Sequence, residues 1–364
     1  MLKLPHQNTK HKRTGVIIIF HYIKNVDISQ EPPLIAEALL DKGRNGRERP
    51  WRAYKMANEL LSLAYQSVNE KKAERLKWCC KTIEADVKKD TGELVRIVGF
   101  SSCRVRLCPL CAWRRSLKNF WNTIKIVKWL QSHQETVGKY SYVFITLTVK
   151  NCRGEALSAT IDELYSAVKR LYERKEVKKA FVGMVRNLEV THNTDPKSKD
   201  YDTFHPHFHM IAAVRPSYFT SRDYISQKRL REIWRECLRV DYDPQVDVRR
   251  VKSKGGDNPS GCEAAAAVAE CSKYAAKSAD FIIPDDWDLT VETVRILDAA
   301  LDRRRLINYS GIFREVSQRL KLEDCEDGNL INVGEELPDV DKSELERVTY
   351  WWYSGYRQYY KIEK

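Results

Sequence analysis

The sequence predicts an α+β protein with an antiparallel sheet, preceded by a helical module rich in cysteine and followed by a helical extension. Two observations predict this class. Residues 142–251 alternate between the apolar period of strands and that of helices. Upstream of them, helical periodicity and closely spaced cysteines occupy one basic stretch. We therefore divide the chain into an irregular arm (1–50), a basic helical module (51–138), a central domain (139–282) and a C-terminal helical region (283–364) with an acidic linker and an aromatic tail.

Charge is unevenly distributed along the chain. Its 364 residues include 63 Lys and Arg against 50 Asp and Glu, a net charge of +13. Residues 323–346 hold ten acidic residues and one lysine, a net of −9, which leaves +22 on the remainder. Such a surplus favours a polyanionic partner such as nucleic acid. Because no segment is apolar and long enough to span a bilayer, we expect a cytoplasmic protein without a membrane partner.

The N-terminal arm and the helix after it have different patterns. Pro32, Pro33, Gly43 and Gly46 interrupt the first 50 residues, which predicts an irregular, loosely packed segment. From residue 51 a helical pattern begins, with apolar residues at Met56, Leu60 and Leu63. This helix leads into the first cysteines of the chain.

Five of the ten cysteines are clustered in the basic module. Cys103, Cys108 and Cys111 form a C-x4-C-x2-C pattern, and Cys79 and Cys80 lie upstream across a helix-like stretch and a turn. In a reducing compartment, cysteines grouped in this way are typical ligands of structural Zn²⁺, which takes four in a tetrahedron. We predict Zn²⁺ on Cys80, Cys103, Cys108 and Cys111, with Cys79 as the alternative to Cys80. Ordinary burial of cysteines in a core is the competing interpretation.

Basic and aromatic residues follow the cysteines. Residues 94–134 hold eight Lys and Arg and no acidic residue, and five Phe and Trp are interleaved with them. Basic side chains contact phosphates and aromatic rings stack on bases, so the pattern favours a DNA-binding module. The competing interpretation is a solvated basic helix with a packing side. The predicted DNA-binding residues are Arg104, Arg106, Arg114, Arg115 and Lys118.

The central domain contains six predicted elements. A strand near 142–149 precedes a helix with its apolar stripe from Leu157 to Leu171, and strands follow at 181–191 and 204–214. A helix containing Leu230, Ile233 and Trp234 then leads to a strand at 246–251. The order β-α-β-β-α-β predicts a ferredoxin-like or RRM-like antiparallel sheet, with two helices on one face and the other face open to ligand.

Three of the eight histidines lie within five residues, in His205-Pro206-His207-Phe208-His209. Alternation along the strand places His207 and His209 on one face. If the second and third strands form a hairpin, Glu189 falls beside His207. Two imidazoles and a carboxylate leave coordination positions open, which predicts a catalytic Mg²⁺ or Mn²⁺. Asp202 and His205 are alternative third ligands, and a polar sheet face with hydrogen-bonded imidazoles is the competing interpretation.

An alanine-rich segment from 262 to 279 has strong helix propensity. On a helix, Glu270, Tyr274 and Lys277 share one face. A tyrosine that attacks a phosphodiester forms a covalent ester that stores the bond energy for rejoining. The metal would polarise the phosphate and Lys277 would stabilise the developing charge. The competing interpretation is a half-buried tyrosine beside an ion pair between Glu270 and Lys273.

These motifs occur in a recognisable order. The segments Phe144-Ile145-Thr146-Leu147-Thr148, His205 to His209, and Glu270 through Tyr274 to Lys277 are accompanied by Cys108-Pro109-Leu110-Cys111 upstream and Arg305 to Gly311 downstream. Over roughly residues 75 to 315 the chain resembles the rolling-circle plasmid replication initiators of the HUH endonuclease superfamily.

The resemblance implies site-specific nicking of double-stranded plasmid origin DNA, which also presents a single-stranded hairpin. It implies a 5′-phosphotyrosine on Tyr274, a free 3′-OH that primes synthesis, and Glu270 activating water at termination. It also implies a host helicase and DNA polymerase as partners. Two other functions compete with this one: an HUH transposase or relaxase with the same chemistry, and a non-catalytic, zinc-dependent DNA-binding regulator.

The C-terminal tail is rich in aromatic residues. Trp352, Tyr356 and Tyr359 recur at helical spacing, which predicts a helix that docks on the body of the protein; stacking on single-stranded DNA is the alternative. The acidic stretch before the tail is expected to be a solvated linker, and an inhibitory DNA mimic is the alternative.

Overall fold

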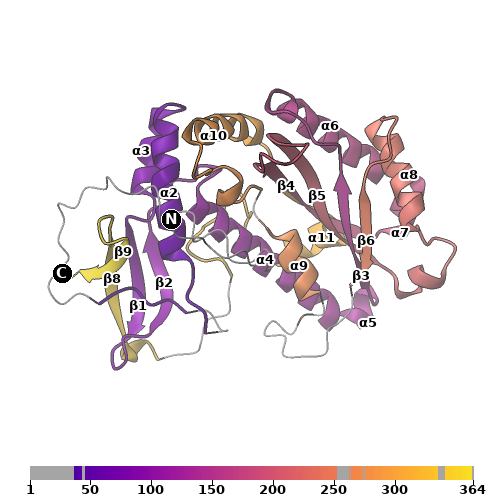
Figure 1. The fold of residues 1–364 in the computed structure, drawn as a ribbon. Helices are drawn as coiled ribbons and strands as arrows, with labels where there is room; N and C mark the ends of the chain where they lie inside the picture. The colour runs from indigo at the N-terminus through magenta and orange to yellow at the C-terminus, as the bar shows by residue number, and fades with distance from the viewer. Residues whose placement is uncertain are drawn as a thin grey trace, which may run out of the picture.

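In a computed structural model of the chain, residues 37–42, 46–251, 262, 264–273, 275–334 and 341–362 are described. They form two lobes, each built on an antiparallel sheet, with the long helix α4 (Pro109–Ser132) passing from one lobe to the other (Figure 1). The mixed α+β class is confirmed. Most of the predicted N-terminal arm lies outside the described residues, and the four-part division of the chain stays a prediction.

The first lobe combines segments from both ends of the chain. Helices α2 (Trp51–Gln66) and α3 (Glu70–Trp78) precede strands β1 (Thr82–Lys88) and β2 (Leu94–Phe100). Strands β8 (Leu345–Tyr353) and β9 (Gln358–Ile362) complete a four-stranded sheet in the order β2-β1-β8-β9. The helix-like stretch expected after Cys80 is therefore wrong, because these residues form a hairpin. Ile83, Ala85 and Val87 point from β1 into the core at the two-residue period of a strand.

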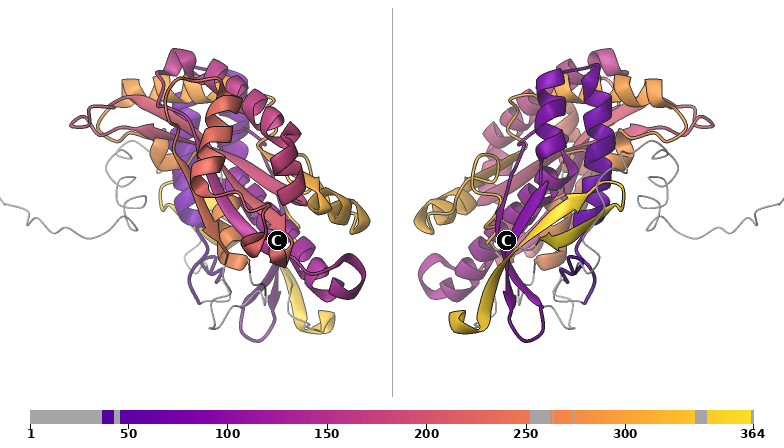
Figure 2. Two further views of the ribbon diagram at one scale, coloured as in Figure 1. Left: turned by 90° about the vertical axis from the view of Figure 1, so that its right-hand side faces the viewer. Right: turned by 90° about the vertical axis from the view of Figure 1, so that its left-hand side faces the viewer.

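The aromatic tail is a β-hairpin, so the predicted tail helix is also wrong. Figure 2 shows the β8–β9 hairpin beside β1, which offers backbone partners along its whole length. Trp352 and Tyr359 are fully buried with ring centroids 4.8 Å apart. The Trp352 indole donates to Glu59 over 2.7 Å, and the Tyr359 hydroxyl donates to the Cys80 carbonyl over 2.7 Å. Docking of the tail on the body is thus confirmed, although through strands.

The second lobe contains a five-stranded antiparallel sheet in the order β6-β3-β5-β4-β7. Its strands are β3 (Ser141–Thr148), β4 (Gly183–Asn193), β5 (Thr203–Val214), β6 (Val246–Arg250) and β7 (Ile307–Gly311). Helix α6 (Gly154–Glu173) lies between β3 and β4 in the chain and α8 (Gln227–Leu238) between β5 and β6, as the apolar periods predict. The short helices α5 (Gln134–Val137) and α7 (Lys175–Ala180) precede β3 and β4.

Both faces of this sheet are covered. Leu147, Phe208 and Met210 pack under α6 and α8, whereas Phe144, Val185 and Ile211 pack under α4, α9 (Ala265–Cys271) and α11 (Ile312–Arg319). The expectation of an open second face is therefore wrong for most of the sheet. The reason is that this face is itself apolar over most of its length and must be buried. The polar residues Thr146, Glu189, His207 and His209 gather toward the end of this face near Thr148.

The predicted helix from 262 to 279 is shorter than expected. Among the described residues of this segment, the helix α9 ends at Cys271, and Lys277 precedes the 3-10 turn η3 (Ser278–Asp280). Tyr274 lies outside the described residues. The Asn187 side chain donates to the Lys273 carbonyl and the Val190 N–H donates to the Ala275 carbonyl, so the chain follows β4 instead of continuing as a helix.

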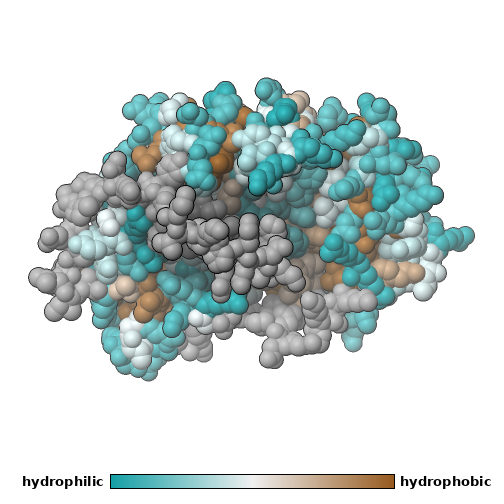
Figure 3. Space-filling model, viewed as in Figure 1, coloured by the Kyte–Doolittle hydropathy of each residue, from teal (hydrophilic) through white to brown (hydrophobic). Residues whose placement is uncertain are grey.

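Helix α10 (Trp287–Leu301) connects the two lobes. It packs beside α6 and also reaches the first lobe (Figure 1), where Asp298 accepts from Tyr65 over 2.6 Å and pairs with Lys72 over 2.7 Å. Two further 3-10 turns are η2 (Pro216–Thr220) and η4 (Lys342–Glu344). On the face drawn in Figure 3, the described side chains are mainly hydrophilic, with small separate apolar patches. No helix within the described ranges has the length and apolar character needed to cross a membrane.

Candidate active site and cysteine cluster

The first candidate site lies on three adjacent strands. In the register of the sheet, His207 is opposite Glu189 on β4 and His209 is opposite Thr146 on β3. The hairpin expected between the second and third strands is present. Because residues opposite each other on antiparallel strands have close side chains, the register alone brings the carboxylate and both imidazoles together.

Glu189, His207 and His209 form a tight group. The nearer oxygen, Oε2 of Glu189, lies 3.0 Å from Nε2 of His209 and 3.7 Å from Nε2 of His207. The ligand atoms of the three residues lie within 4.8 Å of one another, and all three side chains are buried. A buried carboxylate between two imidazoles can bind a divalent cation and leave further coordination positions open.

Each imidazole is oriented through its other nitrogen. Nδ1 of His207 is 3.0 Å from the carbonyl of His205, and Nδ1 of His209 is 3.2 Å from Oγ1 of Thr146. Partners of this kind hold a ligand ring in one orientation, here with Nε2 directed at Glu189. Thr146 belongs to the first motif of the sequence, but its contact with His209 was not foreseen, because it depends on the pairing of β3 with β5.

The alternative third ligands lie outside this group. Asp202 contacts His192, with Oδ1 2.9 Å from Nε2. His205 is on the same face of β5, but Nδ1 of its ring has no hydrogen-bond partner in the described structure. Burial, together with the charge of His207, lowers the pKa of His205 to about 4. The geometry therefore favours Glu189 over both.

Lys277 adds a positive charge to the site, next to the Glu189 carboxylate. Its Nζ lies 2.9 Å from Oε1 of Glu189. Burial raises the pKa of Glu189, but hydrogen bonds from His207 and His209 and the charge of Lys277 outweigh it and hold the pKa well below its usual range. Burial likewise lowers the pKa of Lys277, but Glu189 outweighs it and the net pKa is raised. The carboxylate and the ammonium are thus both charged at neutral pH.

The segment between α9 and η3 is anchored beside Glu189. Asn187 and Val190, which flank Glu189 on β4, bond the carbonyls of Lys273 and Ala275. Glu270 is paired with Lys273, the competing interpretation drawn from the sequence, and it is not part of the Glu189 group. The residues on either side of Tyr274 are therefore held on the strand that carries the candidate metal ligand.

Asp280 is a site residue that the sequence did not reveal. Its carboxylate accepts from the backbone N–H of Lys277 over 2.7 Å and closes the turn that carries this lysine. Burial raises the pKa of Asp280 to about 6. No pattern in the sequence indicates this contact, because it forms only if the helix ends at Cys271 and does not continue to residue 279 as predicted.

A pocket separates α4 from this anchored segment. Its polar lining includes Arg106, Arg115 and Ser116 from the first lobe, and Asn187, Lys273 and Glu326 from the other side. Ser116 donates to the Ser272 carbonyl, so the two walls are in direct contact at this point. The basic module and the segment that contains Tyr274 therefore meet at one place.

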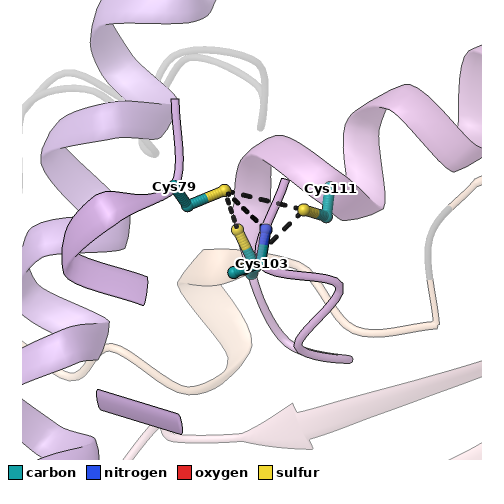
Figure 4. Close-up of side chains that lie close together, drawn as sticks. Cys79, Cys103 and Cys111 are labelled. Carbon is teal, nitrogen blue, oxygen red and sulfur yellow. Dashed lines mark hydrogen bonds between the residues drawn. The ribbon is translucent and has the colours of Figure 1, made fainter. Parts of the chain in front are cut away.

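The second candidate site is a cluster of four cysteines. Cys79, Cys103, Cys108 and Cys111 are buried with their sulfurs within 4.8 Å of one another, and Figure 4 shows Cys79, Cys103 and Cys111 directed at a common point. The Cys79 sulfur is 3.6 Å from those of Cys108 and Cys111, and the Cys103 and Cys111 sulfurs are 3.7 Å apart. Tetrahedral Zn²⁺ with Zn–S bonds of about 2.3 Å separates its sulfurs by about 3.8 Å. The cluster fits such an ion.

The fourth cysteine of this cluster is Cys79 and not Cys80, which corrects the predicted ligand set. Cys80 has a positive φ of 50°, so the chain turns sharply after Cys79. The two residues are adjacent and equally buried, and only the turn decides which thiol faces the knuckle at the start of α4. Hydrogen bonds from Cys103, Cys108 and Cys79, together with the charge of Arg115, lower the pKa of Cys111 despite its burial.

The predicted DNA-binding residues are mostly engaged inside the protein. Arg114, Arg115 and Lys118 are buried, which contradicts a solvent-exposed role for these three. Arg114 donates to the carbonyls of Leu330 and Ile331, and Lys118 pairs with Glu323.

Two of the predicted residues are more accessible. Arg104 is exposed, and Arg106 pairs with Glu326 at the pocket. Glu323 and Glu326 thus belong to a packed segment, so the acidic stretch is not a solvated linker at its start. Residues 335–340 of that stretch lie outside the described residues.

Comparison with known proteins places the chain in a family. A family model described as "Replication protein" matches residues 95–360, so the chain belongs to the replication protein family. A Protein rep from Bacillus amyloliquefaciens is 35% identical over 343 residues, 88% of this chain and 96% of the relative. A Protein rep from Streptococcus pneumoniae is 34% identical over 84% of this chain and 90% of the relative.

These relatives confirm the resemblance to plasmid replication initiators that the motifs predicted. A third relative, from Lentilactobacillus hilgardii, is 34% identical over 87% of this chain and 96% of its own length. No solved structure matches the chain.

Proposed function

We propose that this replication initiator nicks one strand of a plasmid double-strand origin by HUH-type chemistry, with Tyr274 as nucleophile. The observation that carries the proposal is the buried group of Glu189, His207 and His209, with Lys277 on Glu189 and both neighbours of Tyr274 anchored to β4. A DNA-binding regulator without catalysis has no use for such a group.

The arrangement of the sheet supports an HUH core. The strand order β6-β3-β5-β4, with α6 and α8 on one face, is that of a ferredoxin-like fold, to which β7 adds an edge strand. The histidines are on the central strand β5 and face away from these helices. This is the arrangement expected if the face under α6 and α8 is structural and the opposite face carries the chemistry.

Glu189, His207 and His209 would hold Mg²⁺ or Mn²⁺, which suits mixed nitrogen and oxygen ligands with positions left open. When bound, the ion supplies Lewis acidity to the scissile phosphate. His205 and Thr146 keep both rings oriented for this task. Lys277, at 2.9 Å from Glu189, brings a second positive charge to the place where the phosphate gains negative charge.

In the nicking step, the Tyr274 oxygen forms a bond to phosphorus while the bond from phosphorus to the 3′ oxygen breaks. The phenol loses its proton and the departing 3′ oxygen gains one, so the products are a 5′-phosphotyrosine and a 3′-OH primer. At termination, Glu270 would accept a proton from water that attacks the second phosphodiester. Lys273 lies beside it as an ion-pair partner.

The first lobe would contribute origin binding. Its cysteine cluster holds α3 against the start of α4 and would contain structural Zn²⁺. Arg104 and Arg106 are the predicted DNA-binding residues that are not buried: Arg104 is exposed, and Arg106 lines the pocket. Host helicase and DNA polymerase complete the proposed reaction, because the duplex must be opened and the 3′-OH must be extended by a polymerase.

The proposal is tested with labelled DNA from the replicon that encodes the chain, followed over time on a denaturing gel. Tyr274→Phe keeps the ring but removes the attacking oxygen, so the covalent protein-DNA adduct should disappear while origin binding remains. Retention of the adduct by this variant would exclude Tyr274 as the nucleophile. Loss of binding instead would indicate a structural role.

Glu270→Gln separates the two steps. It should form the adduct at a rate near that of the unmodified protein, but release the DNA slowly, because tyrosine and water use separate proton acceptors. Lys273→Gln is the matched control, since it removes the partner of Glu270 and leaves the carboxylate. If Glu270→Gln abolishes the first nick, Glu270 serves the tyrosine or the metal, and the proposed division of roles is wrong.

A further inference from the structure

Lys55 is a fully buried lysine on α2. Its Nζ donates to the carbonyl of Cys79 over 2.8 Å, to the carbonyl of Lys77 over 3.0 Å and to Oδ1 of Asn58 over 3.2 Å. All of these acceptors are neutral, and no carboxylate pairs with Lys55 anywhere in the described ranges. A buried ammonium without a counter-charge is costly, so a negative charge is expected close by.

The cysteine cluster is the group beside Lys55. One of its acceptors is the backbone of Cys79 itself, and Asn58, on the same face of α2, donates through Nδ2 to the sulfur of Cys108 over 3.3 Å. Four neutral thiols would supply no charge. Four thiolates around a divalent ion carry a net charge of −2, since four negative sulfurs exceed the charge of the ion by two.

Arg115 is a second buried cation at the cluster. It lies four residues after Cys111 on α4, hence on the same helix face. Its guanidinium donates to the carbonyl of Arg104, next to Cys103, and its buried Nε has no hydrogen-bond partner. Like Lys55, it has no carboxylate partner among the described residues. Two buried cations therefore flank a cluster that needs two positive charges.

We propose that Lys55 and Arg115 are the counter-charges of a four-thiolate metal centre on Cys79, Cys103, Cys108 and Cys111, and that Asn58 stabilises the Cys108 thiolate by its hydrogen bond. This inference rests on the structural metal of the proposed function and assigns residues outside the ligand set. It also reassigns Arg115, whose sequence context predicted contact with DNA.

A purely structural role for Lys55 makes a different prediction. Lys77 and Cys79 lie at the C-terminal end of α3, so Lys55 could serve only to bind the last carbonyls of that helix. In that case its removal would destabilise the metal-free and the metal-loaded protein equally and leave metal affinity unchanged. Compensation of charge lowers the affinity for the metal itself.

The experiment measures Zn²⁺ affinity of the full chain by competition with a chromophoric chelator, and thiolate ligation by the absorption of bound Co²⁺. Lys55→Met should weaken Zn²⁺ binding about 10- to 100-fold, as the loss of an outer partner of a metal ligand does. Lys72→Met is the matched control. Because Lys72 is on the neighbouring helix and pairs with Asp298, the Zn²⁺ affinity of this variant protein should equal that of the unmodified protein. Equal affinities for all three proteins overturn the inference.

A second pair of variants decides the matter if Lys55→Met does not fold. Arg115→Met should weaken Zn²⁺ binding, whereas Arg115→Lys, which keeps the charge, should restore most of the affinity. Equal affinity of these two variants contradicts the assignment. The proposed metal centre is judged separately by the zinc content of the unmodified protein: a chain purified without zinc and unable to bind it would exclude the centre itself, whatever the variants do.

Discussion

The cysteine cluster and the Glu189 cluster are both buried, yet their surroundings differ. The cysteine cluster has four ligand residues, and the lysine beside it, Lys55, is fully buried. The Glu189 cluster has three, and the side chain of its lysine, Lys277, is 43% exposed. A closed four-ligand site leaves no position for substrate, while an open three-ligand site does. The difference is consistent with the proposed structural role of the first site and the proposed catalytic role of the second.

Cys79→Ser gives the largest expected effect on stability. A structural Zn²⁺ contributes about 10 kcal/mol or more to folding, so loss of one thiolate should release the ion and unfold the first lobe. The measurement is zinc content together with limited proteolysis. Cys80→Ser is the matched control, since Cys80 is equally buried but outside the cluster, and it should keep its zinc. The opposite result would restore Cys80 as the ligand.

His207→Ala with His209→Ala should strongly reduce cleavage. Loss of metal at the open site removes several kcal/mol of transition-state stabilisation, so nicking should fall about 1000-fold or more. DNA affinity should change little, because it rests on phosphate contacts elsewhere. Chelation of the metal in the unmodified protein should have the same effect on nicking. Full nicking by the double variant with EDTA present contradicts the catalytic metal.

Trp352→Ala tests whether the tail belongs to the first lobe. Removing a fully buried indole should lower the free energy of unfolding by about 3–5 kcal/mol. The first lobe should therefore unfold more easily and release zinc faster. Trp351→Ala, on the partly exposed side of the same strand, should cost clearly less. Thermal unfolding followed by tryptophan fluorescence measures both. Equal losses of stability in the two variants would contradict the assignment of Trp352 to the core of the first lobe.

Asp280→Asn gives the smallest expected effect, and it depends on pH. Burial raises the pKa of Asp280 from 3.8 to about 6, so the folded state holds this proton more tightly than the unfolded state. Ionisation of Asp280 therefore lowers stability progressively as pH rises from about 4 to about 6. In EDTA, Asp280→Asn should be about 1–3 kcal/mol more stable than the unmodified protein above pH 6 and similar to it near pH 4. A constant difference across this range would contradict the assignment.

Several features of the site could be predicted from the sequence because they follow from local periods. Alternation along β5 placed His207 and His209 on one face, and the hairpin placed Glu189 opposite His207. The order of strands and helices from 142 to 251 predicted the elements of the sheet in the same way. The family followed from the order of the motifs, and the comparisons confirm it.

Other features were decided by contacts between distant segments. The tail aromatics fit a helical period as well as a strand period, and the free edge of β1, some 260 residues earlier, made them strands. The sequence predicted a basic surface at Arg114 and Lys118, but residues 323–331 pack over these side chains in the structure. The end of α9 at Cys271 depends on hydrogen bonds from β4.

The sequence by itself determined the chemistry available to this protein: two imidazoles on one strand face, a carboxylate in reach, a thiol knuckle, and lysine and tyrosine shortly after an alanine-rich helix. Tertiary structure alone decided which adjacent cysteine faces the knuckle, which basic side chains reach solvent, and which buried cations surround the thiols. The physical reason is that side-chain direction within a strand or helix follows from local geometry. Burial and charge pairing depend on which distant segment packs against each surface.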